Sequence, residues 1–281
     1  ARWGHDFKMI TDPYGKKTGF ENELDRFNSD QKKDWLNAYT PKNDKMKKQN
    51  LSGKDLALWK FNRYLKDYLR TIQSVDDGVG ELLDYLDREG LSENTIVVYT
   101  SDQGFYLGEH GWFDKRFMYE ESLRTPLLIR YPKEIKPGIK IPQMIQNLDF
   151  APTFLDYAGI TASKEFQGMS FKNIVNQKET KWRDAIYYTY YEYPSVHMVK
   201  RHYGVRTERY KLMHFYYDID EWELYDLKED PSEMKNVYNS PQYKKIQDNL
   251  HLRLKELRKE YGDSDSLDLM HIKRYVSKTN K

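Results

Sequence analysis

The spacing of apolar residues predicts one long amphipathic helix in the first third of the chain. From Lys54 to Glu89, leucine, isoleucine, valine and aromatic residues recur every three or four positions, which is the period of one helix face. Gly90 follows and is expected to end the helix. Residues 1–53 are polar and lack this period, apart from the short stretch SDQKKDWLNAY. We therefore expect them to wrap a surface, mostly as loops such as TDPYGKKTGF.

Two short apolar runs in the middle of the chain predict β-strands. TIVVYT, residues 95–100, and TPLLIRYP, residues 125–132, are rich in β-favouring residues. A helix, a tight turn and a fully apolar strand in succession are typical of an α/β fold, so parallel neighbours are expected for residues 95–100. MYEESLR can form a helical turn. The segment PQMIQNLDFAPTFLDYAGI predicts a further amphipathic helix, which Gly159 is expected to end.

The pattern changes near residue 180. Three aromatic, alternating segments follow, which predict antiparallel strands: AIYYTYYEYP, YGVRTERYKLMHFYY and EWELYDL. A charged amphipathic helix is expected over residues 240–262, and the tail from Asp263 is expected to be loosely held. Three parts are predicted: a surface-wrapping segment at 1–53, an α/β part at 54–179 and an antiparallel subdomain at 180–281.

Composition excludes several classes of protein. The 46 Lys and Arg residues nearly balance the 44 Asp and Glu residues, so no field of one sign points to nucleic acid. No apolar run approaches the roughly 18 residues of a membrane span. Cysteine is absent, which excludes disulfides, thiolate metal sites and a cysteine nucleophile within this chain. The first residues lack a signal-peptide pattern, so an exported parent protein would carry its address upstream.

Polar residues stand directly after the first predicted strand. Asp102 and Gln103 follow residues 95–100, and ligands collect beyond the carboxyl ends of parallel strands. A carboxylate and an amide oxygen suit Ca²⁺ or Mg²⁺, although two ligands are too few for either ion. Alternatively, Asp102 caps a turn and Gln103 is solvated.

Lys115 is the candidate cation for an anionic substrate. Glycines at 104, 108 and 111 allow the loop to fold back, so that Lys115 can point where Asp102 points. An ammonium group there would neutralise a sulfate or phosphate oxygen held by the same metal. A lysine that is simply solvated is the alternative.

The segment YTSDQGFYLGEHGWFDKRFMYEESLRTPLLIRYP resembles the metal-and-lysine segment of the type I, formylglycine-dependent sulfatases of the alkaline-phosphatase-like superfamily. The resemblance continues through QNLDFAPTFLDYAGI, FQGMS and WELYDLKEDPSEMKNVY, and it covers most of residues 54–261. It implies an α/β fold with an alkaline-phosphatase-like sheet sandwiched by helices, here without its N-terminal part, and a smaller C-terminal α+β antiparallel subdomain.

The resemblance also assigns roles to residues. It implies that Asp102 and Gln103 bind calcium and that Lys115 contacts the sulfate. His110 either contacts substrate or shapes the loop. Rim positions of the pocket are expected for Phe105, Trp112 and Arg116.

The Cys/Ser-x-Pro/Ala-x-Arg motif that yields formylglycine does not occur in this sequence, and the early Asp pair and histidine acid of the family have no counterpart. The chain therefore resembles the second part of a sulfatase. We expect it to be inactive unless its missing N-terminal portion supplies the nucleophile. The parent protein is expected in the periplasm, outside the cell or in a lysosome.

Residues 185–227 most resemble the N-acetylglucosamine-6-sulfatase-like group, which acts on heparan-type glycans. His197, Arg201 and His202 are then expected to bind sugar hydroxyls or a neighbouring anionic group. Arg206 either does the same or pairs with an acid. A phosphatase or phosphodiesterase of the same superfamily is an alternative that Gln103 and the spacing to Lys115 disfavour. A non-catalytic glycan-binding module is another, permitted by the missing nucleophile and the 24 tyrosines.

Overall fold

The chain divides into two compact units. The structure is a computed structural model and describes residues 21–195 and 197–279. One unit runs as far as Gly80 and includes Leu107–Asp114, and the other comprises Glu81–Tyr106 and the chain from Lys115 onward. The predicted part boundaries at residues 53 and 179 stay predictions. TDPYGKKTGF and the rest of residues 1–20 lie outside the described residues.

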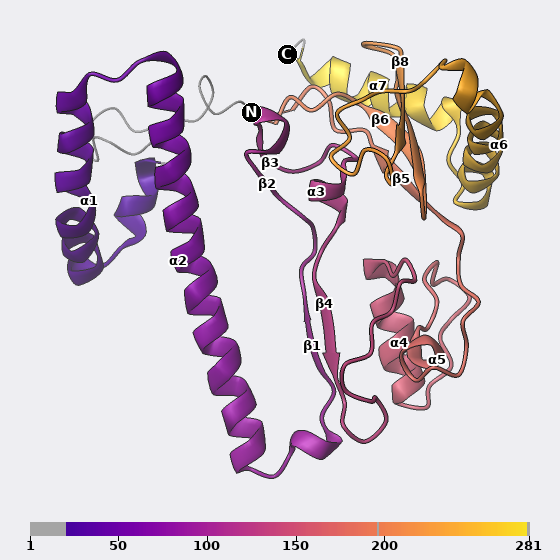
Figure 1. The fold of residues 1–281 in the computed structure, drawn as a ribbon, viewed down its shortest axis with the longest axis horizontal. Coiled ribbons are helices and arrows are strands. Elements are labelled where there is room, and N and C mark those ends of the chain that lie inside the picture. Colours follow the sequence, from indigo (N-terminus) through magenta and orange to yellow (C-terminus); the bar gives the residue numbers. More distant parts are fainter. Residues whose placement is uncertain (1–20, 196, 280–281) are drawn as a thin grey trace. The chain divides into compact units, whose positions relative to one another are not determined.

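Two helices build the first unit (Figure 1). α2 (Gly53–Arg88) confirms the long predicted helix, which continues into the second unit. α1 (Ser29–Gln49) is longer than the predicted stretch and contains Pro41. The guanidinium of Arg63 on α2 lies 4.4 Å from the centre of the Tyr39 ring on α1. This cation–π contact ties the two helices together.

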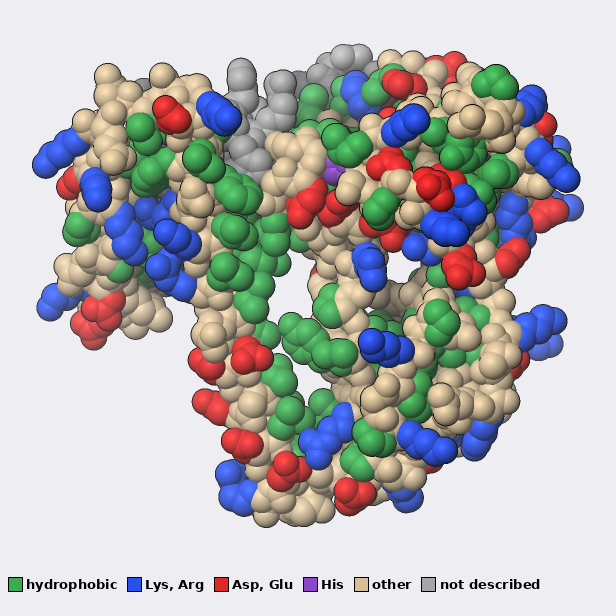
Figure 2. Space-filling model, in the orientation of Figure 1, with side chains coloured by type: hydrophobic (Ala, Val, Ile, Leu, Met, Phe, Trp, Pro, Cys, Tyr) green, Lys and Arg blue, Asp and Glu red, His purple; other side chains and the backbone are tan. Residues whose placement is uncertain are grey.

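Apolar side chains remain exposed along α2. Figure 2 shows hydrophobic side chains gathered along this helix. Leu58 and Leu69 are each more than half exposed, at 54% and 53%. The face that the sequence pattern assigns to a core is therefore only partly covered by the described residues.

The two central strands pair with each other. β1 (Val97–Thr100) and β4 (Leu127–Arg130) confirm the two predicted strands, but they run antiparallel. The expectation of parallel neighbours for residues 95–100 is wrong within the described residues. The loop from Ser101 returns the chain to the end of β1 that it left, so β4 runs back along β1. An unbroken apolar run cannot by itself distinguish the two directions.

The predicted antiparallel subdomain is confirmed as a four-stranded meander. β5 (Ala185–Tyr190), β6 (His202–Thr207), β7 (Tyr210–Phe215) and β8 (Glu221–Asp226) pair in sequence order. Helix α6 (Lys244–Glu260) packs against this sheet through Leu250, Leu254 and Leu257. Val205, Leu212 and Leu224 form the fully buried centre of this core.

The tail from Asp263 is helical, so the expectation that it is loosely held is wrong. α7 (Asp265–Thr279) buries Ile272 and Asp268, each 6% exposed. Arg258 binds Asp265 and Asp268 at 2.8 and 2.7 Å and so holds the first turn of α7.

The remaining elements are short. They are η1 (Glu21–Arg26), η2 (Ser92–Asn94), β2 (Tyr106–Leu107), η3 (Glu109–Gly111), β3 (Phe113–Asp114), α3 (Glu120–Leu123), η4 (Asn147–Asp149), α4 (Phe150–Tyr157), α5 (Lys172–Val175) and η5 (Pro241–Tyr243).

Candidate functional site

The two predicted metal ligands lie in the loop that leaves β1. Asp102 is exposed and Gln103 is partly buried. The amide of Asn147 donates to the Asp102 carbonyl at 2.7 Å, and the Ser101 hydroxyl donates to the Gln103 carbonyl at 2.8 Å. These bonds fix the backbone of the loop, and the Ser101 hydroxyl also lies 3.4 Å from one carboxylate oxygen of Asp102.

Gly104 fixes this loop against α3. Its N–H donates to the carbonyl of Ser122 at 2.8 Å. A Cβ at Gly104 would lie 2.0 Å from the carbonyl oxygen of Glu121, which is far inside contact distance. Only glycine therefore allows the ligand-bearing loop to approach α3 this closely.

The predicted cation lies near one of the predicted rim residues. The Lys115 ammonium lies 5.7 Å from the centre of the Phe105 ring. A cation over an aromatic face at this distance is attracted to the ring. Phe105 can thus hold the lysine stem while the ammonium stays partly accessible, which suits a group that must meet an anion.

Arg116 and His197, both predicted to contact substrate, are brought together. A guanidinium nitrogen of Arg116 lies 2.8 Å from His197 Nε2. Arginine can only donate, so Nε2 of His197 is the acceptor in this contact. The pair joins the loop after Lys115 to the segment before β6.

Ser122 on α3 serves both segments of the predicted site. Its carbonyl accepts from Gly104 and its hydroxyl accepts from the backbone N–H of Arg116, each at 2.8 Å. The side chain is buried, with 7% of the residue exposed. Ser122 therefore holds both the segment that carries Asp102 and the segment that carries Lys115.

A buried ionic cluster holds α3 in place. Lys211 is fully buried, and its ammonium lies 2.7 Å from Glu233 and 3.0 Å from Glu120. Arg206 binds the Glu120 carboxylate through two nitrogens at 3.1 and 3.2 Å. Glu233 also accepts from the Glu120 backbone N–H at 2.7 Å. The alternative that Arg206 pairs with an acid is thereby confirmed.

Two opposite pKa shifts result from this cluster. Burial alone would raise the pKa of Glu120, but Lys211 and Arg206 outweigh it and lower this pKa to about 2. For Glu233, burial outweighs Lys211 and the pKa is raised. Glu120 is therefore the firmly ionised member of the cluster.

Arg201 and His202, the other predicted substrate-binding residues, are each 0% exposed. Arg201 is paired with Asp218 at 2.7 Å. His202 Nδ1 bonds the Lys200 carbonyl at 2.8 Å, and burial lowers the pKa of His202 to about 4, against the smaller opposing effect of the Lys200 and Arg116 backbone. Their burial points to support of the neighbouring loops and disfavours direct contact with a sugar.

His110 and Trp112 belong to the first unit. They lie at η3, where His110 adopts a φ of 55° and its ring centre is 5.7 Å from that of Trp112. A non-glycine residue with this φ is uncommon. The role of His110 in substrate binding stays a prediction.

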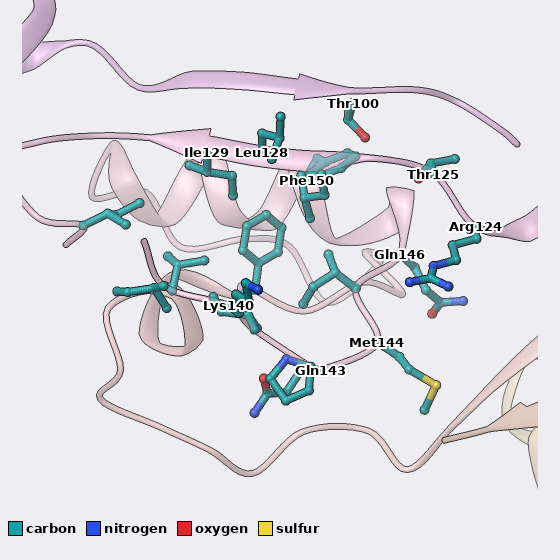
Figure 3. Close-up of a pocket in the computed structure, with 18 of the residues that line it drawn as sticks. Thr100, Arg124, Thr125, Leu128, Ile129, Lys140, Gln143, Met144, Gln146 and Phe150 are labelled. Atoms are coloured by element: carbon teal, nitrogen blue, oxygen red, sulfur yellow. The ribbon is translucent and has the colours of Figure 1, made fainter. Parts of the chain in front are cut away.

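A large cavity opens within the second unit beside the strand pair. It measures about 1080 Å³. Figure 3 shows Ile129 and Phe150 pointing into it, with Arg124 and Gln146 at one end. Asn147, which holds the Asp102 carbonyl, also lines it. A hydrogen bond from Asn147 therefore connects the cavity wall to the predicted metal-binding loop.

The oxygen donors of Asp102 and Gln103 suit a hard dication such as Ca²⁺, but they make only part of a site. In the part of the chain that the structure describes, His, Asp and Glu residues nowhere gather in threes as a metal site would need. Likewise, none of the described helices has both the length and the apolar content needed to cross a bilayer.

Sequence reasoning missed Ser122, Tyr188 and Glu233. Ser122 lies within the resembling segment, but nothing in the local pattern distinguishes it from an exposed helical serine. Tyr188, whose hydroxyl donates to the Arg116 carbonyl at 2.6 Å, is one tyrosine in an alternating aromatic strand. Only Gly104 carried a usable signal, because a glycine after a strand often marks a close backbone approach.

Two family models match the chain. The sulfatase model matches residues 7–160, and the model of the C-terminal region of N-sulphoglucosamine sulphohydrolase matches residues 108–260.

Individual relatives point the same way. An N-acetylglucosamine-6-O-sulfatase from Bacteroides thetaiotaomicron is 53% identical over 234 residues, which cover 82% of this chain and 42% of that protein. An extracellular sulfatase homologue from Drosophila melanogaster is 36% identical over 124 residues, or 44% of this chain and 11% of that protein. A solved structure in complex with its substrate D-glucosamine-2-N,6-O-disulfate superposes with a TM-score of 0.84 at 50% identity, over 88% of this chain and 51% of that one. The chain thus spans about half or less of the relatives it matches.

Proposed function

Because the chain belongs to the sulfatase family, we propose that the complete polypeptide hydrolyses sulfate esters of glycans, with a 6-O-sulfate on glucosamine or N-acetylglucosamine as the ester attacked. The observation that carries this proposal is the 53% identity to an N-acetylglucosamine-6-O-sulfatase over most of the chain. The relative solved with D-glucosamine-2-N,6-O-disulfate supports the same substrate class. An extracytoplasmic location, in the periplasm, a lysosome or the medium, is part of the proposal and is supported by the relative named as extracellular.

Lys115 has the central role in this proposal. Sulfuryl transfer concentrates negative charge on the sulfate oxygens, and a positioned ammonium stabilises that charge. Partial burial over the Phe105 ring keeps the ammonium from the full screening of bulk water. Lys115 thus acts electrostatically and needs no change in its own protonation.

Asp102 and Gln103 are proposed to hold calcium together with ligands from outside this chain. When bound, the ion would neutralise sulfate charge alongside Lys115. The nucleophile, a formylglycine, is likewise proposed to come from outside this chain, because the sequence contains neither a cysteine nor the serine form of the motif. The half-exposed apolar face of α2 supports further packing by such a portion.

Recognition of the sugar is proposed to involve the Arg116–His197 pair. The Arg116 guanidinium lies 2.8 Å from His197, and a guanidinium suits a hydroxyl or a second anionic group as its partner. Phe105 offers an apolar face to the sugar ring.

Sulfate release from glucosamine 6-sulfate by the complete polypeptide, with and without a calcium chelator, tests the proposal. We expect the polypeptide to release sulfate and the chelator to abolish this release. The same glycan carrying a 6-phosphate should be a poor substrate. Lys115→Ala should lower kcat by about 10²–10³-fold, the usual cost of one such electrostatic group. Lys244→Ala, at an exposed lysine on α6, is the matched control and should retain activity.

The outcomes separate the alternatives. Faster hydrolysis of the phosphate ester would identify a phosphatase. Glycan binding without any hydrolysis would identify a binding module. A Lys115→Ala enzyme within about threefold of the unsubstituted rate, roughly 0.7 kcal/mol in barrier, would show that Lys115 is merely solvated.

A further inference from the structure

The backbone of Arg116 adopts a conformation that its own chemistry disfavours. Its φ is +99°, although it carries a long side chain. Non-glycine residues in sparsely populated regions of this kind cost about 1–3 kcal/mol and persist only where the surroundings hold them. Arg116 directly follows Lys115, so its backbone sets the direction from which the candidate cation projects.

Two side chains from separate elements hold this one residue. Ser122 on α3 accepts a hydrogen bond from the Arg116 N–H at 2.8 Å. Tyr188 on β5 donates to the Arg116 carbonyl at 2.6 Å. Both polar groups of the Arg116 backbone are therefore fixed, one by α3 and one by the C-terminal sheet.

The two holding residues are themselves well fixed. Ser122 lies on α3, which the ionic cluster of Glu120, Lys211 and Glu233 anchors. Burial raises the pKa of Tyr188 to about 12, so its hydroxyl stays protonated and can donate throughout the neutral range. His202 packs against the Tyr188 ring, with ring centres 5.6 Å apart. The Ser122 hydroxyl and the Tyr188 hydroxyl are therefore held rigidly where they meet the Arg116 backbone.

We propose that Ser122 and Tyr188 form a clamp on the Arg116 backbone that positions Lys115 and Arg116 for the substrate. The inference rests on the proposed function, since it assigns positioning residues to that same site. Neither residue is proposed to touch substrate. The clamp explains how two residues that bind neither the metal nor the sulfate would control the rate.

Conservative substitutions can remove each arm of the clamp. Tyr188→Phe deletes only the hydroxyl that reaches the Arg116 carbonyl. Ser122→Ala deletes the hydroxyl but keeps the carbonyl that accepts from Gly104. Tyr187→Phe is the matched control, because Tyr187 directly precedes Tyr188 on β5 and its hydroxyl bonds Asp263 instead. Ser170→Ala removes a comparable hydroxyl bond to Asp156.

Two measurements on the complete polypeptide test the clamp. Steady-state kinetics on glucosamine 6-sulfate should give kcat values reduced about 10-fold or more for Tyr188→Phe and Ser122→Ala, because small misplacements of catalytic groups are costly. Peptide-level hydrogen exchange should show about 2–10-fold faster exchange at residues 115–117, as expected for one lost hydrogen bond. The control variants should change neither quantity.

The two measurements keep the inference and the proposed function separately refutable. If the unsubstituted polypeptide hydrolyses no sulfate ester, the proposed function fails while hydrogen exchange still tests the clamp. If kcat for both clamp variants stays within about twofold of the unsubstituted enzyme, Ser122 and Tyr188 do not position the site. Equal losses of kcat in the Tyr187→Phe control would mean that general destabilisation is responsible, which also overturns the clamp.

Discussion

Replacing Lys211 by methionine should destabilise the protein by about 3–5 kcal/mol, the usual cost of breaking one side of a buried ion pair. Methionine keeps most of the volume of the lysine stem, so the packing change is small. The change in electrostatic energy is large, because the lost ammonium belongs to a side chain that is 0% exposed and lies within 3.0 Å of two carboxylates. After the substitution Glu120 still binds Arg206, whereas Glu233 loses the ammonium that it contacted at 2.7 Å.

The sign of the pH dependence follows from Glu233. In the unsubstituted protein two carboxylates face two cations, so the cluster is neutral, whereas Lys211→Met leaves an excess negative charge. Glu233 can remove that excess by binding a proton, and burial already raises its pKa above the ordinary 4.5. A raised folded-state pKa gives stability that is present at low pH and lost as the pH rises through it. The penalty should therefore be larger at pH 7 than at pH 5.

Urea unfolding of the complete polypeptide, followed by tryptophan fluorescence, measures the effect. With slopes of about 1–3 kcal/mol per molar, the midpoint should fall by roughly 1–5 M. Lys211→Met combined with Glu233→Gln restores a neutral cluster and should recover most of the loss. Lys244→Met breaks an exposed pair on α6 and should cost less than about 0.5 kcal/mol. A cost for Lys211→Met no larger than this control would refute the reasoning.

Two further substitutions probe other features of the second unit. Gly104→Ala places a Cβ 2.0 Å from the Glu121 carbonyl oxygen, so α3 and the Asp102 loop must separate. We expect sulfatase activity to fall at least 10-fold, because catalytic groups are then misplaced. Gly78→Ala, at an open position without a positive φ, is the control and should retain activity. Retained activity in Gly104→Ala would contradict this. His202, with its pKa lowered from 6.5 to about 4, should lose stability as the pH falls from 6.5 to 4, by up to about 3 kcal/mol. His202→Phe cannot titrate there, so parallel stability curves for the two proteins would exclude His202 as the source.

Local periodicity predicted the elements well, whereas their pairing needed information that local pattern does not hold. The helix from Lys54 and the strands at residues 95–100 and 125–132 are found close to the expected positions because each follows from spacing within a short window. The direction of the strand pair depends on where the intervening loop returns. α7 was missed because its first turn is held by ion pairs from Arg258 on α6, seven and ten residues earlier in the chain, which helical spacing does not reveal.

For the candidate site too, the sequence identified the residues of a local motif but not the contacts that depend on the tertiary fold. Asp102, Gln103 and Lys115 were identified from one contiguous motif, and the structure adds that Phe105 accompanies the lysine and that Arg116 meets His197. The buried positions of Arg201 and His202 could not be read from the sequence, since a basic and aromatic stretch is equally typical of an exposed turn. The supports of the site come from α3 and β5, and their convergence is a property of the tertiary fold.

The C-terminal subdomain therefore has a role beyond covering a core. α3 contains four residues, which is too short to be stable by itself. It stays in place because Lys211 and Arg206 on the sheet bind Glu120, and because Glu233 accepts from the first N–H of the helix. Since α3 in turn holds Gly104 and Arg116, a change in the charges of the sheet reaches both the Asp102 loop and Lys115. Substitutions in β6 and β7 should consequently alter kcat although the substituted residues do not contact substrate. The decrease in kcat should grow with the degree to which α3 unfolds.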